Sequence, residues 1–313
     1  MKINNQVQFI TINNNESGQR IDNFLFTRLK RLPKNMVYRI IRKGEVRINM
    51  GRVKHKYKLK ENDLIRIPPV LLKYSQQNTA LYNLDKVVAL TKYIIYEDED
   101  LLVLNKPSGM SVHGGSGVNF GVIEALRILY HETSFLELVH RLDRETSGAL
   151  LIAKKRSVLR ALHQQLRLKQ MQKQYIALVK GQWPSHIKVI KVPLLKNISQ
   201  SGKRVVKVSD YGKYSETHFE IQKHFLNFTL VKVTPITGRT HQIRVHTQYA
   251  SYPIACDNRY GDLDFNKQLT VLGLNRLFLH ASSLMFIHPV STKKLILNAP
   301  LDKGLKTFLE RFY

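Results

Sequence analysis

The chain is poor in cysteine, in acidic residues and in long apolar runs, and these shortages exclude several classes of protein. Cys256 is the only cysteine among 313 residues, so neither an intrachain disulfide nor a zinc site built on cysteines can form. No apolar run approaches the ~20 residues of a membrane-spanning helix. The polar residues 1–20 show no secretory signal. We therefore expect a cytoplasmic protein that does not span a membrane.

The scarcity of acids leaves a large positive charge. The chain has 50 Lys and Arg residues against 23 Asp and Glu residues, for a net charge of +27. Residues 1–70 hold 16 basic and 5 acidic residues, and residues 151–215 hold 15 basic residues and a single acid, Asp210. The sequence contains no block of five or more like charges, which would have indicated a disordered charged tail. The charge therefore predicts a folded protein whose partner is a polyanion, with nucleic acid as the first candidate.

Residues 20–68 show the pattern of a small module of helices and strands. Apolar residues at helical spacing predict two helices, the first ended by Pro33 and the second followed by Gly44 as a cap residue. The helices are expected at 20–32 and 34–43, and the strands at 45–49 and 63–68. The polar side of the second helix carries the cations Arg39, Arg42 and Lys43.

The rest of the chain predicts a larger α+β domain. Residues 71–86 have no clear period and are interpreted as a linker. From residue 87 to residue 313, strands and helices mix without strict βαβ alternation. Strands are expected at 94–96, 101–105, 150–153, 175–179 and 228–233, and helices at 157–168 and 302–312.

The stretch from His140 to Gly148 carries the strongest chemical signal. It places ionisable residues in a loop that leads directly into an apolar strand, which is a common position for catalytic groups. The charges of Arg141 and Arg144 should keep the carboxylate of Asp143 ionised, and an ionised carboxylate can act as a base or a nucleophile. Taken alone, such an aspartate is more often a cap or a salt-bridge partner.

Two further stretches hold candidate residues. Thr240 follows a glycine turn and is expected as a helix N-cap, which places Arg244 in or just after the first helical turn. The helix dipole disfavours a cation there, so Arg244 needs another reason for its position, such as a carboxylate partner. Tyr175 begins a predicted strand, and taken alone it is more often a half-buried strand tyrosine.

The histidines do not indicate a metal site. His241 and His246 are five residues apart, whereas two ligands on one helix face are four apart. We expect no metal, and we interpret the twelve histidines as polar surface groups or RNA contacts.

The motifs together resemble those of the RluA-type pseudouridine synthases. They are Asn105–His113, His140–Gly148, Lys173–Ala177 and Thr237–His246, and residues 20–68 resemble the S4 RNA-binding domain. The resemblance implies an S4-like domain at 1–70, the linker at 71–86 and a synthase domain at 87–313. It also implies that the synthase domain is built on a mixed, mainly antiparallel sheet.

The resemblance implies an activity and roles for single residues. The enzymes of this family flip a uridine out of RNA and isomerise it to pseudouridine without a cofactor. By resemblance, Asp143 is the catalytic carboxylate, Arg244 pairs with it, Tyr175 stacks on the base and Arg141 fills the gap left by the flipped uridine. The S4 cations that are expected to contact RNA are Arg39, Arg42 and Lys43.

The expected substrate is large-subunit ribosomal RNA, and the expected state is a monomer. Two alternatives stay open. The same chemistry could act on another RNA, such as transfer RNA, or the chain could be a non-catalytic factor for ribosome assembly that binds RNA through the S4 module. The second alternative explains the charge but not the motif context of Asp143, Tyr175 and Arg244.

Overall fold

The computed structural model describes most of the chain as two compact units. The units are Met1–Tyr82 and Asn83–Tyr313. The interpreted linker at 71–86 and the helix-ending Pro33 lie outside the described residues. The structure describes residues 6–29, 32, 34–69, 87–114, 120–133, 135–198 and 204–312.

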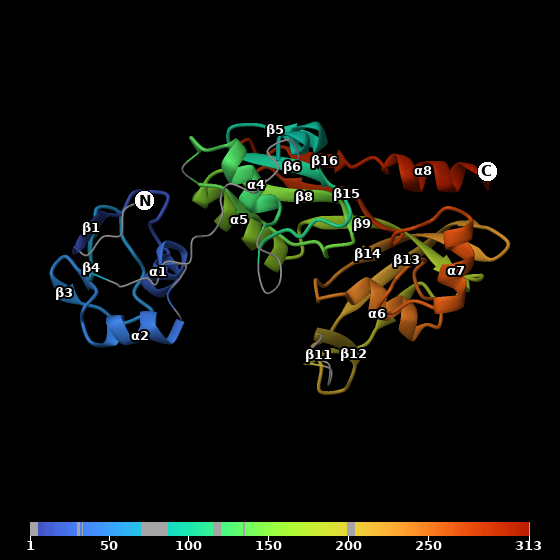
Figure 1. The fold of residues 1–313 in the computed structure, drawn as a ribbon, viewed down its shortest axis with the longest axis horizontal. Helices are drawn as coiled ribbons and strands as arrows, with labels where there is room; N and C mark the ends of the chain where they lie inside the picture. Colours follow the sequence, from blue (N-terminus) through green and yellow to red (C-terminus); the bar gives the residue numbers. More distant parts are fainter. Residues whose placement is uncertain are drawn as a thin grey trace. The chain divides into compact units, whose positions relative to one another are not determined.

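The N-terminal unit packs two helices with a four-stranded antiparallel sheet of order β1-β4-β2-β3 (Figure 1). Both predicted helices and the second predicted strand are present. The first helix ends at Arg28 rather than at residue 32, the strand expected at 45–49 is shorter, and the first strand was not expected. The elements are β1 (Gln8–Thr11), α1 (Ile21–Arg28), α2 (Lys34–Arg42), β2 (Arg47–Ile48), β3 (Gly51–Arg52) and β4 (Leu64–Ile67).

Apolar spacing explains how α2 packs. Val37, Ile40 and Ile41 are buried and share one core with residues of α1 and of the sheet. Gly44 ends this segment at φ +71°, a conformation that a side chain would strain, as its prediction as a cap residue requires. The cations on the other side of α2 remain exposed to solvent.

The C-terminal unit contains the remaining helices and strands. Of its strands, β5, β6, β8, β9 and β14 were expected, as were the helices α5 and α8. The elements are η2 (Ala89–Tyr93), β5 (Ile94–Glu97), β6 (Leu101–Lys106), α4 (Val122–Leu129), β7 (Glu137–Leu138), β8 (Ser147–Ala153), α5 (Arg156–Arg167), β9 (Gln172–Lys180), β10 (Val189–Lys191), β11 (Leu194–Ile198), β12 (Arg204–Val208), β13 (Glu216–His224), β14 (Phe228–Pro235), α6 (Gln242–Tyr249), α7 (Leu263–Val271), β15 (Leu279–Ile287), β16 (Lys294–Asn298) and α8 (Lys303–Glu310).

One large mixed sheet organises this unit and confirms the α+β prediction. Its strand order is β10-β13-β14-β9-β15-β8-β6-β5, with β16 beside β15 and β7 beside β8. Its pairs are antiparallel except β8 with β15, which is parallel. In Figure 1, α4 and α5 lie at the end with β5, β6 and β8, and α6 and α7 lie at the end with β13 and β14.

The central strands are buried on both faces. In β8, Leu150 and Ile152 join one apolar cluster, while Leu151 and Ala153 join a second. Neighbouring residues of a strand point to opposite faces, so the two clusters lie on opposite sides of the sheet. Residues of α4 belong to the first cluster and residues of α5 to the second. This two-sided core gives the loops at the ends of β8 and β9 a rigid base.

Several histidines contradict their interpretation as surface groups. His246, His280 and His288 are at most 4% exposed, and each makes a hydrogen bond inside the unit.

In the part of the chain that the structure describes, no helix combines the length and apolar character needed to cross a membrane.

Candidate active site

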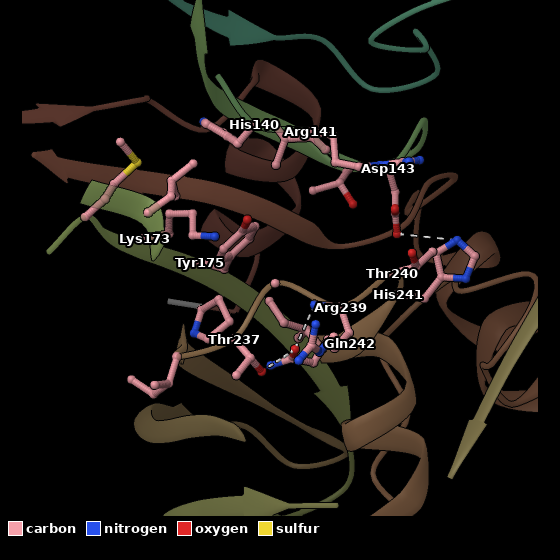
Figure 2. Close-up of a pocket in the computed structure, with 18 of the residues that line it drawn as sticks. His140, Arg141, Asp143, Lys173, Tyr175, Thr237, Arg239, Thr240, His241 and Gln242 are labelled. Atoms are coloured by element: carbon pink, nitrogen blue, oxygen red, sulfur yellow. Dashed lines mark hydrogen bonds and ion pairs between the residues drawn. The ribbon is translucent and has the colours of Figure 1, made fainter. Parts of the chain in front are cut away.

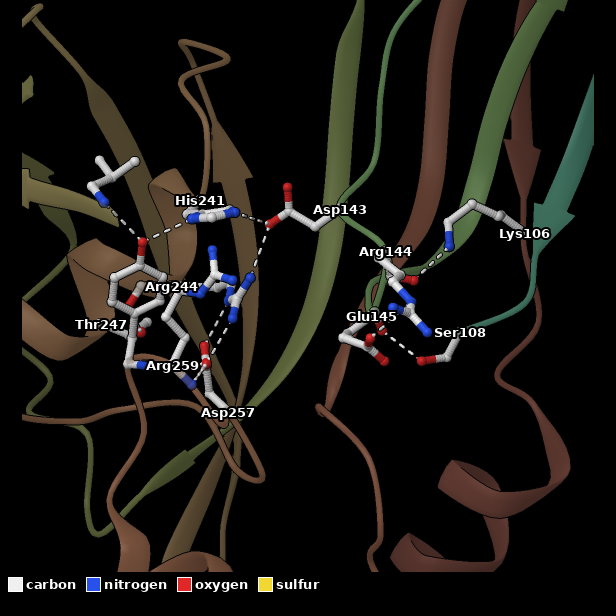
Figure 3. A network of polar contacts seen from close by, with 12 residues as sticks. Lys106, Ser108, Asp143, Arg144, Glu145, His241, Arg244, Thr247, Asp257 and Arg259 are labelled. Carbon is white, nitrogen blue, oxygen red and sulfur yellow. Dashed lines mark hydrogen bonds and ion pairs between the residues drawn. The ribbon is translucent and has the colours of Figure 1, made fainter. Parts of the chain in front are cut away.

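Asp143 lies in the loop between β7 and β8, and the β6 end holds that loop in place (Figure 3). Gly109 N–H donates to the carbonyl oxygen of Arg144 at 2.9 Å, and Ser108 Oγ donates to the carbonyl oxygen of Glu145 at 2.7 Å. These bonds involve the two residues that follow Asp143. The backbone at Asp143 is therefore held on the side opposite the residues that contact its carboxylate.

Lys106 is the main support of this loop. Its side chain is fully buried, and Nζ donates to the carbonyl oxygens of Pro107 and Met110 at 2.8 Å and of Arg144 at 3.0 Å. Burial lowers the pKa of Lys106 to about 7, whereas three carbonyl acceptors favour its charged form. Three fixed bonds from one buried atom tie two segments that are far apart in the sequence.

Gly148 allows β8 to approach β15 directly after the loop. Its φ is +110°, and a Cβ atom there would lie 2.2 Å from the carbonyl oxygen of Ala281. A side chain would therefore push the two strands apart just where they form their parallel pair. The glycine that closes the motif has a packing reason for its presence.

Arg244 comes from the first turn of α6, as expected, but the helix begins differently from the prediction. The N-cap residue is His241, with φ +53°, and not Thr240. The buried Gln242 fixes this start, because its Oε1 accepts from Thr237 Oγ1 at 2.7 Å and from Arg239 N–H at 3.0 Å. The turn that precedes the helix is thus held by side-chain bonds rather than by a threonine cap.

Arg244 joins two carboxylates. It donates from Nε and Nη2 to both oxygens of Asp257 at 2.7 Å, and from Nη1 to Asp143 Oδ2 at 3.3 Å. Burial opposes its charge, but the hydrogen bonds and charge of Asp257, followed by the charge of Asp143, raise the pKa of Arg244. A paired fork of this kind fixes direction as well as charge. The guanidinium is thereby aimed at Asp143.

Asp257 is itself held from several directions. Its Oδ1 also accepts from the backbone N–H groups of Arg259 at 2.9 Å and Tyr260 at 3.0 Å. Burial alone would raise the pKa of Asp257, but the hydrogen bonds and charge of Arg244 and these two N–H groups lower it. The pair therefore remains ionised inside the protein.

The groups that contact the Asp143 carboxylate come from outside its own loop. Arg144 donates from Nε to the carbonyl oxygen of Gly109 at 2.9 Å and approaches Glu145 at 3.5 Å, so its charge is directed away from Asp143. Among the described residues, the basic side chains that approach the Asp143 carboxylate are Arg244, at 3.3 Å, and His241, at 3.8 Å. The partners come from a segment about 100 residues away in the sequence.

A cavity of about 540 Å³ opens at this point, within the usual size range of ligand sites. Figure 2 shows it, with Asp143 and Arg141 on one wall and Tyr175 and Lys173 on another. Arg244 also lines it. The structure therefore brings Arg141, Asp143, Tyr175 and Arg244 together.

Tyr175 and Lys173 face the cavity from β9. Tyr175 is 8% exposed, and burial followed by the negative charge of Asp143 raises its pKa. Burial also lowers the pKa of Lys173. Neither side chain makes a hydrogen bond within the described residues, so both polar ends are available to a bound molecule.

A cluster elsewhere has ligand types that suit a metal, but its protons argue against one. Asp98, Asp100 and His288 lie together at the turns of β5–β6 and β15–β16. His288 Nδ1 accepts from Ser291 N–H at 3.0 Å, so its proton lies on Nε2, which donates to Asp98 Oδ2 at 3.0 Å. The cluster acts as a hydrogen-bond network between two turns.

Comparison with known proteins finds relatives for both parts of the chain. Residues 100–249 match the family model described as RNA pseudouridylate synthase, and residues 19–65 match the S4 domain. The ribosomal large subunit pseudouridine synthase C of Haemophilus influenzae is 60% identical over 309 residues, which cover 99% of this chain and 96% of that protein. The chain belongs to the RluA-type pseudouridine synthases. Its isomerase class follows from that membership.

Other members of the family agree. The ribosomal large subunit pseudouridine synthase C of Escherichia coli K12 is 59% identical over 307 residues, covering 97% of this synthase and 96% of that one. The solved structure of human RNA pseudouridylate synthase domain containing 4 matches with a TM-score of 0.60 and 29% identity. It covers 73% of this synthase and 96% of its own chain.

Several site residues of this synthase were not among the candidates from its sequence. Asp257 lies in a stretch without a recognised pattern, and Lys106 and Lys173 belong to motifs whose lysines carried no separate signal. His241 was rejected as a metal ligand and interpreted, with the other histidines, as a polar surface group or an RNA contact. The signal that could have found Lys106 is its place at the end of a buried strand, where a lysine is unusual.

Proposed function

We propose that this synthase converts selected uridines of large-subunit ribosomal RNA to pseudouridine. The observation that carries the proposal is the carboxylate of Asp143, held by a buried arginine in a cavity beside Tyr175. The names of the two bacterial relatives described above support ribosomal RNA as the substrate. Their shared length with this chain includes both the S4 module and the catalytic unit.

Asp143 is the proposed catalytic carboxylate. The reaction breaks the N1–C1′ bond of uridine, turns the uracil and joins C5 to C1′, after which C5 loses its proton and N1 gains one. Asp143 either attacks C1′ or removes a sugar proton to give a glycal, and both routes need an ionised carboxylate. Arg244 supports that state because it supplies a fixed positive charge at 3.3 Å.

Tyr175 and Arg141 are the proposed contacts of the flipped nucleotide. Tyr175 presents its ring and a hydroxyl without a hydrogen bond among the described residues to the cavity, which suits stacking on uracil and transfer of the C5 proton. Arg141 is exposed at the cavity wall, where its side chain can enter the space that the uridine leaves. Flipping costs a few kcal/mol, which such contacts would offset.

The S4 module is proposed to bind RNA in addition to the contacts made at the cavity. Arg39, Arg42 and Lys43 are exposed, and none has an ion-pair partner among the described residues. Cations of this kind bind phosphates and release counterions, whatever the sequence of the RNA. We also propose that the protein acts as a cytoplasmic monomer, because its high net charge opposes self-association.

Pseudouridine mapping tests this function. Ribosomal and transfer RNA from cells with and without the protein are treated with carbodiimide and read by primer extension. We expect stops in 23S ribosomal RNA that disappear without the protein and do not return with Asp143→Asn. Stops lost only from transfer RNA would show that transfer RNA is the substrate. Unchanged stops in both RNAs would favour the non-catalytic assembly factor.

A further inference from the structure

His241 lies beside the proposed catalytic carboxylate but has no task in the mechanism above. Its Nε2 is 3.8 Å from Asp143 Oδ2, and its Nδ1 is 2.8 Å from Tyr260 Oη (Figure 3). Its side chain is 12% exposed, and its ring meets that of Tyr260 edge-on with centroids 5.5 Å apart. The imidazole thus bridges a buried hydroxyl and the carboxylate.

The hydrogen bonds around Tyr260 decide which nitrogen of His241 carries the proton. The backbone N–H of Val206, in β12, donates to Tyr260 Oη at 3.0 Å. Within the described residues, the hydroxyl proton then has one acceptor, His241 Nδ1, which must be unprotonated to receive it. The proton of the neutral imidazole therefore lies on Nε2, and its N–H points to Asp143.

The backbone of His241 is also unusual. Its φ of +53° and ψ of +18° lie in the left-handed region, which few residues other than glycine adopt. Such conformations persist where the surroundings enforce them, and they cluster at functional sites. His241 also accepts the first bond of α6, from Val245 N–H at 3.0 Å. One residue therefore starts the helix that carries Arg244 and faces Asp143.

Burial, more than the surrounding charges, keeps the ring of His241 neutral. Burial lowers the pKa of His241 to about 4, the charge of Asp143 opposes this, and Arg244 and Arg259 reinforce it. Asp257 adds a smaller opposing effect. At neutral pH the imidazole is therefore a neutral donor with one fixed tautomer.

We propose that His241 is a positioning residue for Asp143, fixed in one tautomer by Tyr260, and that it shares Oδ2 with Arg244. Both donors face Oδ2, and Oδ1 has no hydrogen bond within the described residues, so Oδ1 is the oxygen presented to the ribose. The present 3.8 Å exceeds a hydrogen bond of about 2.9 Å, and catalytic hydrogen bonds often tighten when substrate binds. The inference rests on the proposed catalytic role of Asp143.

Two substitutions of His241 test whether the side chain acts as a hydrogen-bond donor or only fills space. In His241→Gln the amide nitrogen lies near the place of Nε2 and keeps a donor to Asp143. In His241→Asn the amide ends near Nδ1 and that donor is lost, while asparagine tolerates the left-handed backbone. Tyr260→Phe removes the hydroxyl that fixes the tautomer, and His131→Asn is the control at a histidine whose side chain is 77% exposed.

The measurements are the single-turnover rate at saturating protein, its pH dependence, the RNA dissociation constant and the melting temperature. We expect His241→Asn to be about tenfold slower, the size of a lost hydrogen bond to a charged group. As the pH is lowered, the rate of His241→Asn should also begin to fall at a higher pH than the rate of the wild type. His241→Gln should stay within about threefold of the wild type, and Tyr260→Phe should lie between the two. RNA affinity should not change.

Three results would overturn the proposal. They are a wild-type rate and pH curve for His241→Asn, equal losses in the Asn and Gln variants, or a loss of RNA affinity in place of rate. If His241→Asn does not fold, an unchanged rate for Tyr260→Phe overturns it instead. Asp143→Asn is measured beside them: if it still converts uridine, the proposed function fails, and if it is inactive, a failure belongs to His241 alone.

Discussion

The two units of the synthase hold their charges in opposite ways. On α2 of the N-terminal unit, Arg39 and Arg42 are exposed, and no ion pair holds them within the described residues. In the C-terminal unit, Arg244 is 8% exposed and makes three hydrogen bonds to two carboxylates. Exposed charges are screened and replaceable, whereas a buried pair has a fixed direction. The first arrangement suits binding of RNA, and the second suits a single chemical step.

This contrast refines the meaning of the net charge of +27. Most of the cations belong to basic stretches that can act on phosphates one at a time. The chemistry depends on a small number of charges that are already neutralised in pairs, so composition cannot reveal them. Variants of the two kinds should therefore fail in different assays.

Arg244→Gln should give the largest effect of the variants that test this contrast. It leaves Asp257 buried without its partner, which should cost about 3–5 kcal/mol of unfolding free energy. The rate should fall by roughly 10³-fold, because Asp143 loses its fixed cation. Denaturant unfolding and single-turnover assays measure both.

The control for Arg244→Gln is Arg28→Gln. The Arg28–Glu16 pair, at 2.9 Å, lies at the surface of the N-terminal unit, where removal of a pair costs less than about 1 kcal/mol. If both variants lost the same stability, burial would not distinguish the two units as we describe.

Acid should weaken the C-terminal unit through His246. Burial lowers its pKa to about 4, and Nε2 lies 2.8 Å from Ser215 Oγ. Between pH 6.5 and pH 4 the unfolded chain binds a proton that the folded chain does not, so stability falls as pH falls. The shift corresponds to about 3 kcal/mol, complete below pH 4.

Unfolding at pH 4 and pH 7 measures this effect. His246→Gln keeps a donor to Ser215 without titrating, so its stability should change less between the two pH values. The exposed His131→Gln serves as the control and should follow the wild type. A wild-type pH dependence in His246→Gln would show that other groups cause the loss.

Tyr175→Phe tests how much of the site depends on one hydroxyl. The variant keeps the ring for stacking but loses the proposed proton-transfer group, and we expect a loss of about 10²-fold. Release of tritium from 5-tritiated uridine in RNA measures that step directly. Tyr175→Leu, which loses the ring as well, should be slower still. A wild-type rate for the Phe variant would leave stacking as the only role of Tyr175.

Replacing Arg39, Arg42 and Lys43 together with glutamine should give the smallest effect on chemistry. RNA affinity should fall, and the slope of log K against log salt should decrease by about 2 to 3, since three phosphate contacts are lost. The single-turnover rate at saturating protein should stay within about twofold of the wild type. An unchanged slope would remove these cations from the RNA contact.

Sequence patterns located the fold best where apolar residues alternate or repeat. The runs that became β6, β8 and β9 were recognisable because both faces of these strands are buried. Short strands such as β7 and β10, and the paired β11 and β12, are only two to five residues long and were too short to show a clear period. The start of α6 was misplaced because a left-handed histidine, which follows a turn held by Gln242, replaces the usual cap.

The site was predictable as motifs but not as contacts. Asp143 and Arg244 were named from their own stretches, and the structure joins them over 101 residues of sequence. Asp257 takes two of the three bonds of Arg244, yet its sequence neighbours show no periodicity or charge pattern. Long-range pairing of this kind depends on sheet topology, which local spacing does not encode.

Asp143→Asn tests the central claim most directly when conversion and binding are measured on the same RNA. The variant keeps the size of the side chain and removes its negative charge. We predict that the single-turnover rate falls by at least about 10⁴-fold, the scale seen when a catalytic nucleophile is lost, while the dissociation constant stays within about twofold. A variant that still forms pseudouridine at a measurable fraction of the wild-type rate would contradict the account.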